Sequence, residues 1–344
     1  MTRVSDFDYD LPRELIAQHP ATRRDDAGMM ILERKTGTFT HDLFHNLPGK
    51  LSPKSLLVLN DVRVFPARAR GRVGGSEIEV LFLREIKPAT WDILCRPARK
   101  ASAGTRIVFA PGFEGEVVAA GEEGRRTVRF DAPDVAARLE EVGSAPLPPY
   151  IRRGASDISL RERDLERYQT VFADRGAAVA APTAGLHFTP DILAAIAATG
   201  IDVRRVTLEV GPATFQPVRC ERIDDHKMLS ENIDIPEETA QAVTAAKREG
   251  RPVIAVGTTV VRTLESAWKD GRLRAGKAGT DLFIRPGFTF QVVDVLLTNF
   301  HLPQSTLLML ACAFAGRDFT LRAYAEAVAE KYRFFSYGDC MLIL

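Results

Sequence analysis

The spacing of apolar residues divides the chain into three stretches. The run LLVLN at 56–60 is apolar at successive positions, which is typical of a strand buried on both faces. From about 67 to 149 the apolar positions alternate in short runs broken by glycines, as in EIEVLFLR, WDILCR and GEVVAA. Such runs predict a small antiparallel sheet or barrel. The proline-rich sequence APLPPY at 145–150 closes this stretch and reads as a linker.

After position 150 helical and extended segments alternate. Gly200 and Gly250 follow two of the helical segments, as expected at helix C-termini. The predicted elements are helices over 190–199, 236–249, 258–269, 305–315 and 321–332, and strands over 201–210 and 252–257. We therefore predict an α/β fold in which a larger mixed α/β domain is formed by both chain ends, 1–66 and 150–344. A small antiparallel β-barrel domain, 67–149, is inserted into it.

Composition places the chain among ordinary globular proteins. Its 344 residues are 45% apolar and 26% charged. The N-terminus lacks the long apolar core of a secretory signal, and the most apolar segment, 305–315, is too short to cross a bilayer. Four scattered cysteines show neither a CxxC pair nor metal-ligand spacing. We expect a cytoplasmic, monomeric protein with reduced thiols, no bound metal and no membrane partner.

The formal net charge is only +1, so a nucleic-acid partner would need a local basic patch. One run of basic residues in the predicted barrel contains no acidic residue: Arg96, Arg99, Lys100 and Arg106. These side chains would neutralise RNA phosphates. Positive charge that protects a strand edge is an equally good interpretation.

Several familiar motifs fail on inspection. The segment 271–278 comes within one residue of a phosphate-binding P-loop, but Ala278 stands where a metal-binding hydroxyl is needed, and a helix rather than a strand precedes it. No GxGxxG motif follows a strand. His41 and His45 have helical spacing without the HExxH pattern, which favours surface or packing roles over a zinc site.

Three polar turns remain, each at a point where a strand is predicted to lead into a helix. The turn at 181–189 carries Thr183 and His187, and His187 either transfers protons or packs at a helix start. The turn at 253–262 carries Thr258, Thr259 and Arg262.

Backbone N–H groups and hydroxyls at the second turn suit a carboxylate or phosphate, although a threonine there can also simply cap the helix. The third turn, 298–306, carries Asn299, His301 and Ser305. Three such turns predict one composite pocket.

Long segments of the chain resemble the S-adenosylmethionine:tRNA ribosyltransferase-isomerase family. They include FDYDLPRELIAQHP, LLVLNDVRVFPAR, AAPTAGLHFT, VGTTVVRTLES, LLTNFHLPQSTLLMLACAFAG and YRFFSYGDCMLI. The resemblance runs nearly from end to end. It implies the same fold, a larger α/β domain with an inserted β-barrel.

The resemblance also implies a reaction. S-adenosylmethionine acts as co-substrate, with no permanently bound cofactor, and gives up its ribosyl part to 7-aminomethyl-7-deazaguanine at the tRNA wobble position. The products would be epoxyqueuosine, adenine and methionine. Because a sulfonium acidifies the neighbouring C5′ hydrogens and the acceptor amine must lose a proton, acid/base groups are needed.

We assign candidate roles on this basis. His187 and His301 are the acid/base candidates, with Glu231, Asp294 and Asp339 as carboxylate partners. Arg262 with Thr258 and Thr259 would hold the methionine carboxylate or a tRNA phosphate, and Tyr337 or Phe335 would stack on a base. Thr183, Asn299 and Ser305 complete the expected substrate-binding set.

Some positions depart from the family pattern. Glu209 and Leu229 stand where the family has histidines, Ala213 lies in a usually glycine-rich turn, and Ala27 and Gly28 replace a Ser-Arg pair. Two alternatives therefore accompany the enzyme assignment. One is a divergent relative that binds tRNA or S-adenosylmethionine without turnover, and the other is the same chemistry on another acceptor.

Overall fold

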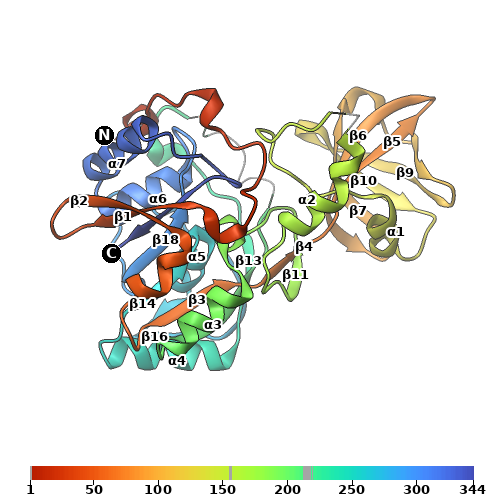
Figure 1. Cartoon of the computed structure of the whole chain (residues 1–344). Coiled ribbons are helices and arrows are strands. Elements are labelled where there is room, and N and C mark those ends of the chain that lie inside the picture. The colour runs from red at the N-terminus through yellow and green to blue at the C-terminus, as the bar shows by residue number, and fades with distance from the viewer. Residues whose placement is uncertain (1, 155–156, 212–217, 219) are drawn as a thin grey trace.

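A closed β-barrel projects from one side of a larger α/β body (Figure 1). The computed structural model describes residues 2–154, 157–211, 218 and 220–344. The predicted fold class is confirmed, because both ends of the chain enter the α/β body and the barrel strands lie between them. Within the described ranges no helix is both long and apolar enough to span a membrane.

One mixed sheet of nine strands organises the α/β body. Its central strands β12, β3, β14 and β18 run parallel to one another. The C-terminal strand β19 pairs antiparallel with β18 and parallel with β1, so the two chain ends lie side by side. In order the strands are β17 (Gly276–Thr280), β13 (Glu231–Ile235), β12 (Asp202–Leu208), β3 (Leu56–Asn60), β14 (Val253–Val256), β18 (Val295–Asn299), β19 (Cys340–Ile343), β1 (Gly28–Glu33) and β2 (Thr38–Leu43).

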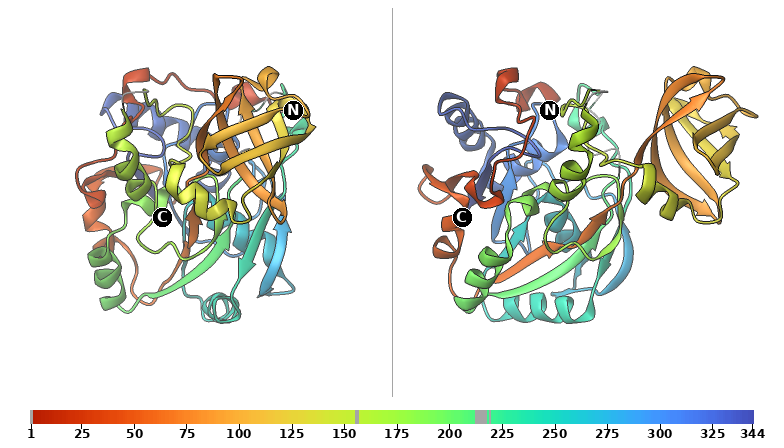
Figure 2. Two further views of the ribbon diagram at one scale, coloured as in Figure 1. Left: turned by 90° about the vertical axis from the view of Figure 1, so that its right-hand side faces the viewer. Right: turned by 45° about the vertical axis from the view of Figure 1, so that its right-hand side comes forward.

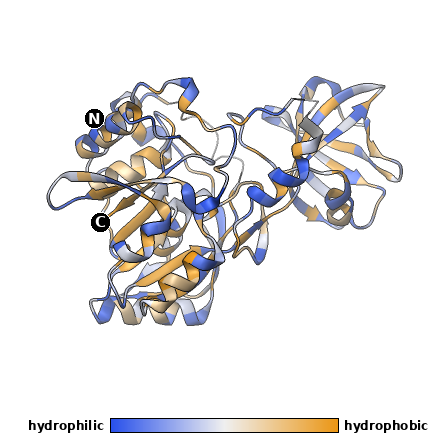
Figure 3. Ribbon diagram, viewed as in Figure 1, coloured by the Kyte–Doolittle hydropathy of each residue, from blue (hydrophilic) through white to orange (hydrophobic). Residues whose placement is uncertain are grey.

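Helices cover both faces of this sheet. Alternate residues of β3 belong to two separate hydrophobic clusters, with Leu56 and Val58 on one face and Leu57 and Leu59 on the other. One face packs against α4 (Glu237–Arg248), α5 (Thr258–Ala267), α6 (Thr306–Ala315) and α7 (Arg317–Ala329), and the other against α3 (Pro190–Ala198) and the 3-10 helix η4 (Phe44–Lys50). All of β3 is therefore buried, as the LLVLN run predicts, and hydrophobic residues predominate in the central strands β3, β14 and β18 (Figure 3).

The barrel has its own core. Aromatic side chains fill its interior, among them Phe82, Phe113 and Phe130, and helix α1 (Val135–Val142) packs against it through Leu139. Around the barrel the strands are β10 (Arg125–Phe130), β7 (Thr90–Arg96), β6 (Ser76–Lys87), β5 (Arg68–Val73), β8 (Arg106–Ala110) and β9 (Phe113–Ala120). The right-hand view of Figure 2 shows that the barrel extends away from the large sheet.

The barrel is joined to the sheet through a buried connection. β4 (Val62–Val64) pairs with β11 (Arg175–Ala178), and Leu165 of α2 (Arg161–Arg167) packs against the cluster that contains Val64 of β4. The segment read as a linker is not loose, because Ala145 and Leu147 are buried in a cluster that also contains Tyr168 and Tyr337. This cluster connects the barrel side of the molecule to the C-terminal tail.

One helix is shorter than the sequence predicts. The helix expected over 258–269 ends at Ala267, and β15 (Trp268–Lys269) turns back onto β16 (Arg272–Leu273). Asp270 and Gly271 have positive φ angles of 53° and 73°, as a tight hairpin requires. The segment that resembles a P-loop is therefore a hairpin turn followed by edge strand β17.

Candidate active site

A pocket lies at the carboxyl ends of the parallel strands, which is where ligands bind in open α/β sheets. All three polar turns contribute to its lining, so the predicted convergence occurs. It encloses about 690 Å³, a volume that includes space open to solvent. The described residues that line it are Tyr150, Ala181, Pro182, Thr183, Ala184, Val210, Gly257, Thr258, Thr259, Thr298, Asn299, Phe300, His301, Leu302, Ser305, Leu307, Phe335 and Ser336.

The first turn is the short 3-10 helix η8 (Thr183–His187), which ends in front of α3. Thr183 lines the pocket, whereas His187 is buried beneath it. Gly185 is required at its position, because a Cβ would lie 2.7 Å from the Phe172 ring and 2.9 Å from Thr170. The turn is thus packed closely against Phe172 and Thr170.

The second turn joins β14 to α5. Gly257 has a φ of +88°, and no side chain caps this described helix start, so the alternative in which Thr258 or Thr259 only caps the helix does not hold. Thr259 instead accepts a hydrogen bond from the Asn60 amide at 3.3 Å. The first N–H groups of a helix lack partners within the helix and carry partial positive charge, so this edge of the pocket favours a carboxylate.

The third turn follows β18. Ser305 lines the pocket but also caps α6, because its Oγ accepts the Leu308 N–H at 3.2 Å. His301 is buried, and its Nε2 lies 2.9 Å from the Thr298 hydroxyl. Burial lowers the pKa of His301 to about 3, so this imidazole is neutral at ordinary pH.

His187 and Asn299 connect the first turn to the third. The Asn299 Nδ2 lies 3.1 Å from His187 Nε2, and a hydrogen bond with the Arg24 backbone raises the pKa of the same ring. An amide N–H can donate only to an unprotonated nitrogen, so Nε2 accepts and Nδ1 carries the proton. The Asn299 Oδ1 is buried without a partner in the described structure, which leaves one acceptor for a ligand in the pocket.

Asp339 supports His187 from the start of β19. Burial lowers the pKa of His187 to about 4, while the Asp339 charge acts in the opposite direction and raises it. The Asp339 carboxylate itself accepts hydrogen bonds from the backbone N–H groups of Gly28 at 3.0 Å and Arg333 at 2.7 Å. It therefore has a fixed position from which it would stabilise a protonated His187.

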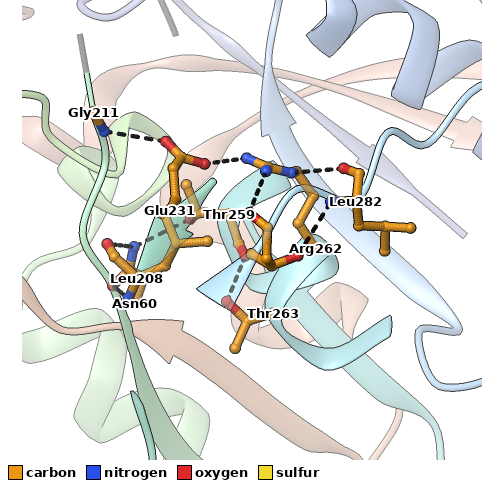
Figure 4. A network of polar contacts seen from close by, with 9 residues as sticks. Asn60, Leu208, Gly211, Glu231, Thr259, Arg262, Thr263 and Leu282 are labelled. Atoms are coloured by element: carbon orange, nitrogen blue, oxygen red, sulfur yellow. Dashed lines mark hydrogen bonds and ion pairs between the residues drawn. The ribbon is translucent and has the colours of Figure 1, made fainter. Parts of the chain in front are cut away.

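Arg262 differs from its expected role. It is absent from the described pocket lining, and its guanidinium forms a buried ion pair with Glu231 behind the second turn (Figure 4). Its Nε also donates to the Leu282 carbonyl at 3.0 Å. Glu231 in turn accepts from the Gly211 N–H at 3.1 Å. The ion pair thus lies behind the second turn, and neither side chain belongs to the described lining of the pocket.

Asp294, predicted as a carboxylate partner, does not belong to the described lining of the pocket. It precedes the first residue of β18, at the opposite end of the strand from Asn299. Lys247 binds its carboxylate at 2.8 Å, and the Val253 N–H donates to it at 2.9 Å. Asp294 thus fixes the amino ends of two strands and lies outside the pocket.

The C-terminal tail is built into the site rather than loose. Phe335 lines the main pocket with its ring 4.7 Å from that of Tyr150, whose hydroxyl lies 2.6 Å from the Ser336 hydroxyl. Tyr337 lines a neighbouring, smaller pocket instead. Sequence reasoning did not identify Tyr150, Ser336 or Asn60, although a polar residue that ends an apolar strand, as Asn60 does, is a usable signal.

The basic run lies on the barrel, away from the pocket. Arg96 and Arg99 are exposed and Lys100 is half-buried. Arg106 forms ion pairs with Asp131 and with Glu114, 3.2 Å from the latter. Carboxylates from other parts of the barrel therefore already neutralise one member of the run.

The departures from the family pattern fall outside the described lining of the main pocket. Glu209 accepts from the Asn232 amide at 3.0 Å, and Leu229 is 51% exposed. Ala213 lies outside the described residues. The Gly28 N–H donates a hydrogen bond to the Asp339 carboxylate, and Ala27 lines the smaller pocket that also contains Tyr337.

Taken together, these features define an α/β enzyme with an inserted barrel and a pocket, partly open to solvent and without a charged carboxylate, lysine or arginine in its described lining, at the carboxyl edge of its parallel strands. A model of the family described as "Queuosine biosynthesis protein" matches residues 4–343, and the chain belongs to this family, the S-adenosylmethionine:tRNA ribosyltransferase-isomerases.

Similar proteins support this membership. The chain is 50% identical to the S-adenosylmethionine:tRNA ribosyltransferase-isomerase of Carboxydothermus hydrogenoformans, over 99% of this chain and 100% of that one. It is 50% identical to the enzyme of the same name from Thermus thermophilus over the whole of both chains. A crystal structure of the S-adenosylmethionine tRNA ribosyltransferase from Thermotoga maritima matches 99% of this chain and 100% of that one, with 37% identity and a TM-score of 0.57.

Proposed function

We propose that this enzyme transfers and isomerises the ribosyl part of S-adenosylmethionine onto 7-aminomethyl-7-deazaguanine at the wobble position of tRNA. Epoxyqueuosine, adenine and methionine are the products. The observation that carries the proposal is the meeting of three polar turns in one pocket beside a buried His187–Asn299 pair. The names of the relatives supply the two substrates.

The pocket has features that fit S-adenosylmethionine. The uncapped start of α5 would hold the methionine carboxylate in place of Arg262, because helix N-termini bind anions through their free N–H groups. The rings of Tyr150 and Phe335 offer faces to a sulfonium or an adenine. The unpartnered Asn299 Oδ1 would accept an N–H from the ligand.

His187 is the stronger candidate for proton transfer. It is neutral at ordinary pH, and Asp339 lies close enough to stabilise the imidazolium that would form. Its Nε2 accepts a proton once a ligand in the main pocket draws the Asn299 amide away from it. Burial lowers the pKa of His301, and no carboxylate of the described structure opposes that shift. We assign His301 the role of orienting the ligand through the Thr298–His301 hydrogen bond.

A labelling assay tests the proposal. The purified protein is incubated with S-adenosylmethionine labelled in the ribose and with tRNA that carries the precursor base. We expect release of one adenine for each label that enters tRNA. Tight binding without adenine release would support the non-catalytic alternative, and adenine release without tRNA labelling would support another acceptor.

The same assay tests the assignment of His187. We expect His187→Gln to lower kcat by roughly 10² to 10⁴, the usual contribution of a proton-transfer group. His41→Gln is the matched control, because His41 is exposed and lies outside both pockets, with its Nδ1 2.9 Å from the Tyr332 hydroxyl and its Nε2 3.6 Å from the Glu326 carboxylate. Equal rates for His187→Gln and the wild-type protein would remove His187 from the mechanism.

The insertion boundaries at 67 and 149 are also part of the proposal. Arg68 is the first residue of the barrel strands, and α1 ends at Val142. We propose that the barrel domain supports tRNA binding through Arg96, Arg99 and Lys100, with recognition of the reacting base left to the pocket.

A further inference from the structure

A second, smaller pocket lies on the other side of His187 from the main pocket. Ser336 lines both pockets, and His187 lines the smaller one while it contacts Asn299 of the larger one. The N-terminal segment, α2, the end of η8 and the C-terminal tail surround it. Its described lining residues are Pro20, Ala21, Arg24, Ala27, Arg167, Leu186, His187, Arg333, Ser336, Tyr337 and Gly338.

This pocket is strongly basic. Arg24, Arg167 and Arg333 line it, and the described lining includes no carboxylate. Asp339 forms an ion pair with Arg333 at 2.8 Å and so offsets one of the three charges. Burial lowers the pKa of Arg24, and repulsion from Arg167 lowers it further. Two half-buried guanidinium groups thus repel one another, and a bound anion would relieve that repulsion.

Backbone carbonyls hold the arginines in place, and the Glu166 carboxylate lies close enough to raise the pKa of both Arg24 and Arg167. Arg24 donates to the Glu166 carbonyl at 2.8 Å, and Arg167 donates to the Ala21 carbonyl at 2.8 Å. Backbone carbonyls orient a guanidinium without cancelling its charge. The Arg167 Nε is buried without a partner in the described structure and remains available as a donor.

Tyr337 supplies an independent indication of a ligand. Its side chain is only 4% exposed, and its hydroxyl has no hydrogen-bond partner in the described structure. Burial raises the pKa of Tyr337, so the phenol keeps its proton and can donate it. The Asp164 carboxylate also raises this pKa, whereas Arg153, Arg167 and Arg24 lower it, so three guanidinium groups and one carboxylate lie near the phenol. A buried donor left unpaired is unfavourable, and a ligand oxygen at this point would satisfy it.

We propose that this pocket binds a phosphodiester group of the tRNA backbone next to the nucleotide whose base enters the main pocket. The assignment rests on the proposed function, because that function supplies the tRNA. An amino-acid carboxylate is the competing anion. It carries an ammonium group two bonds away, which three arginines would repel, whereas a phosphodiester carries no cation.

The sharpest test removes a single oxygen. Tyr337→Phe keeps the ring and deletes the hydroxyl, and we expect the Kd for precursor tRNA to rise roughly tenfold, the value of one hydrogen bond to a charged group. The KM for S-adenosylmethionine should stay unchanged, and thermal stability should be equal or higher. A purely structural hydroxyl would leave the Kd for tRNA unchanged, which would overturn the proposal.

A charge variant gives a second readout. Arg167→Gln should reduce the slope of log Kd for tRNA against log salt concentration by about one, because one phosphate contact is lost. Arg248→Gln makes the same charge change on α4, outside both pockets, and should leave the slope unchanged. Equal slopes for Arg167→Gln and the wild type would contradict the proposal.

Two further outcomes separate this inference from the proposed function. A higher KM for S-adenosylmethionine in Tyr337→Phe, with tRNA binding intact, would assign the pocket to the donor carboxylate and overturn the phosphate assignment. Salt-dependent tRNA binding that weakens in both variants, without ribosyl transfer by the wild-type protein, would support the phosphate site while overturning the proposed reaction.

Discussion

Arg262 and Glu231 form an ion pair in which each side chain is only 7% exposed, directly behind the second polar turn. Both residues were predicted as site residues from the sequence, but their ion pair was not predicted. Thirty-one positions separate them, and the pairing depends on how β13 sits beside the start of α5. By contrast Thr183, Asn299 and Ser305 were predicted as pocket residues, because each lies within a short turn whose position follows from local pattern.

Loss of one partner of this pair should destabilise the protein strongly. Glu231→Ala leaves the Arg262 guanidinium buried without its carboxylate, and we expect the free energy of unfolding to fall by about 3 to 5 kcal/mol. Urea denaturation measures the change.

Glu249→Ala is the matched control. It removes the partner of Arg251 from a pair whose carboxylate is 51% exposed, so its effect should stay below about 1 kcal/mol. Similar losses in the two variants would show that the buried pair has no special structural role.

At the scale of elements, the carboxyl ends of β14 and β18 bring two of the polar turns together, and η8 closes the pocket from a third direction. Helix and strand periodicity predicted most of these elements within a few residues. The end of α5 was missed, because the tight hairpin at Asp270 and Gly271 stops the helix two residues early. The local spacing of apolar residues does not predict such a turn.

Gly185 gives a test of how η8 holds the pocket. A Cβ there would press on the Phe172 ring and on Thr170, so Gly185→Ala should displace the turn and lower stability by about 1 to 3 kcal/mol. We expect kcat to fall with it, since Thr183 and His187 flank the glycine. Thermal unfolding and the labelling assay measure the two effects.

Gly49→Ala is a suitable comparison, because no atom lies within 4 Å of the added Cβ. This variant should retain wild-type activity and stability. Unchanged activity in Gly185→Ala would show that the position of η8 does not matter for the reaction.

At the scale of the whole molecule, the sequence predicts the architecture but not the smaller basic pocket. The α/β body with an inserted barrel could be predicted, because alternation and helical spacing change abruptly near 67 and 149. The smaller basic pocket could not, because Arg24, Arg167 and Arg333 come from three distant segments that only the folded chain brings together. Nothing in their local sequence distinguishes them from surface arginines.

Acid should destabilise the folded protein through its buried histidines. In the unfolded chain a histidine has a pKa near 6.5, whereas folding lowers the pKa of His187 to about 4. Between these values the unfolded state binds more protons, so stability falls as the pH drops from about 6.5 to about 4. At about 1.4 kcal/mol per unit of pKa the loss through His187 reaches about 3 kcal/mol.

Urea denaturation at pH 7 and pH 5 measures this effect. The loss on acidification should be smaller in His187→Asn than in the wild-type protein. Equal stability of the wild type at the two pH values would contradict a neutral, buried His187.

The central claim is that the three polar turns form one site for S-adenosylmethionine, and amide hydrogen exchange tests it most directly. Addition of S-adenosylmethionine should slow exchange together in the turns 181–189, 257–262 and 298–306, while exchange in the barrel strands stays the same. Protection confined to one of these turns, or to the barrel, would contradict the account.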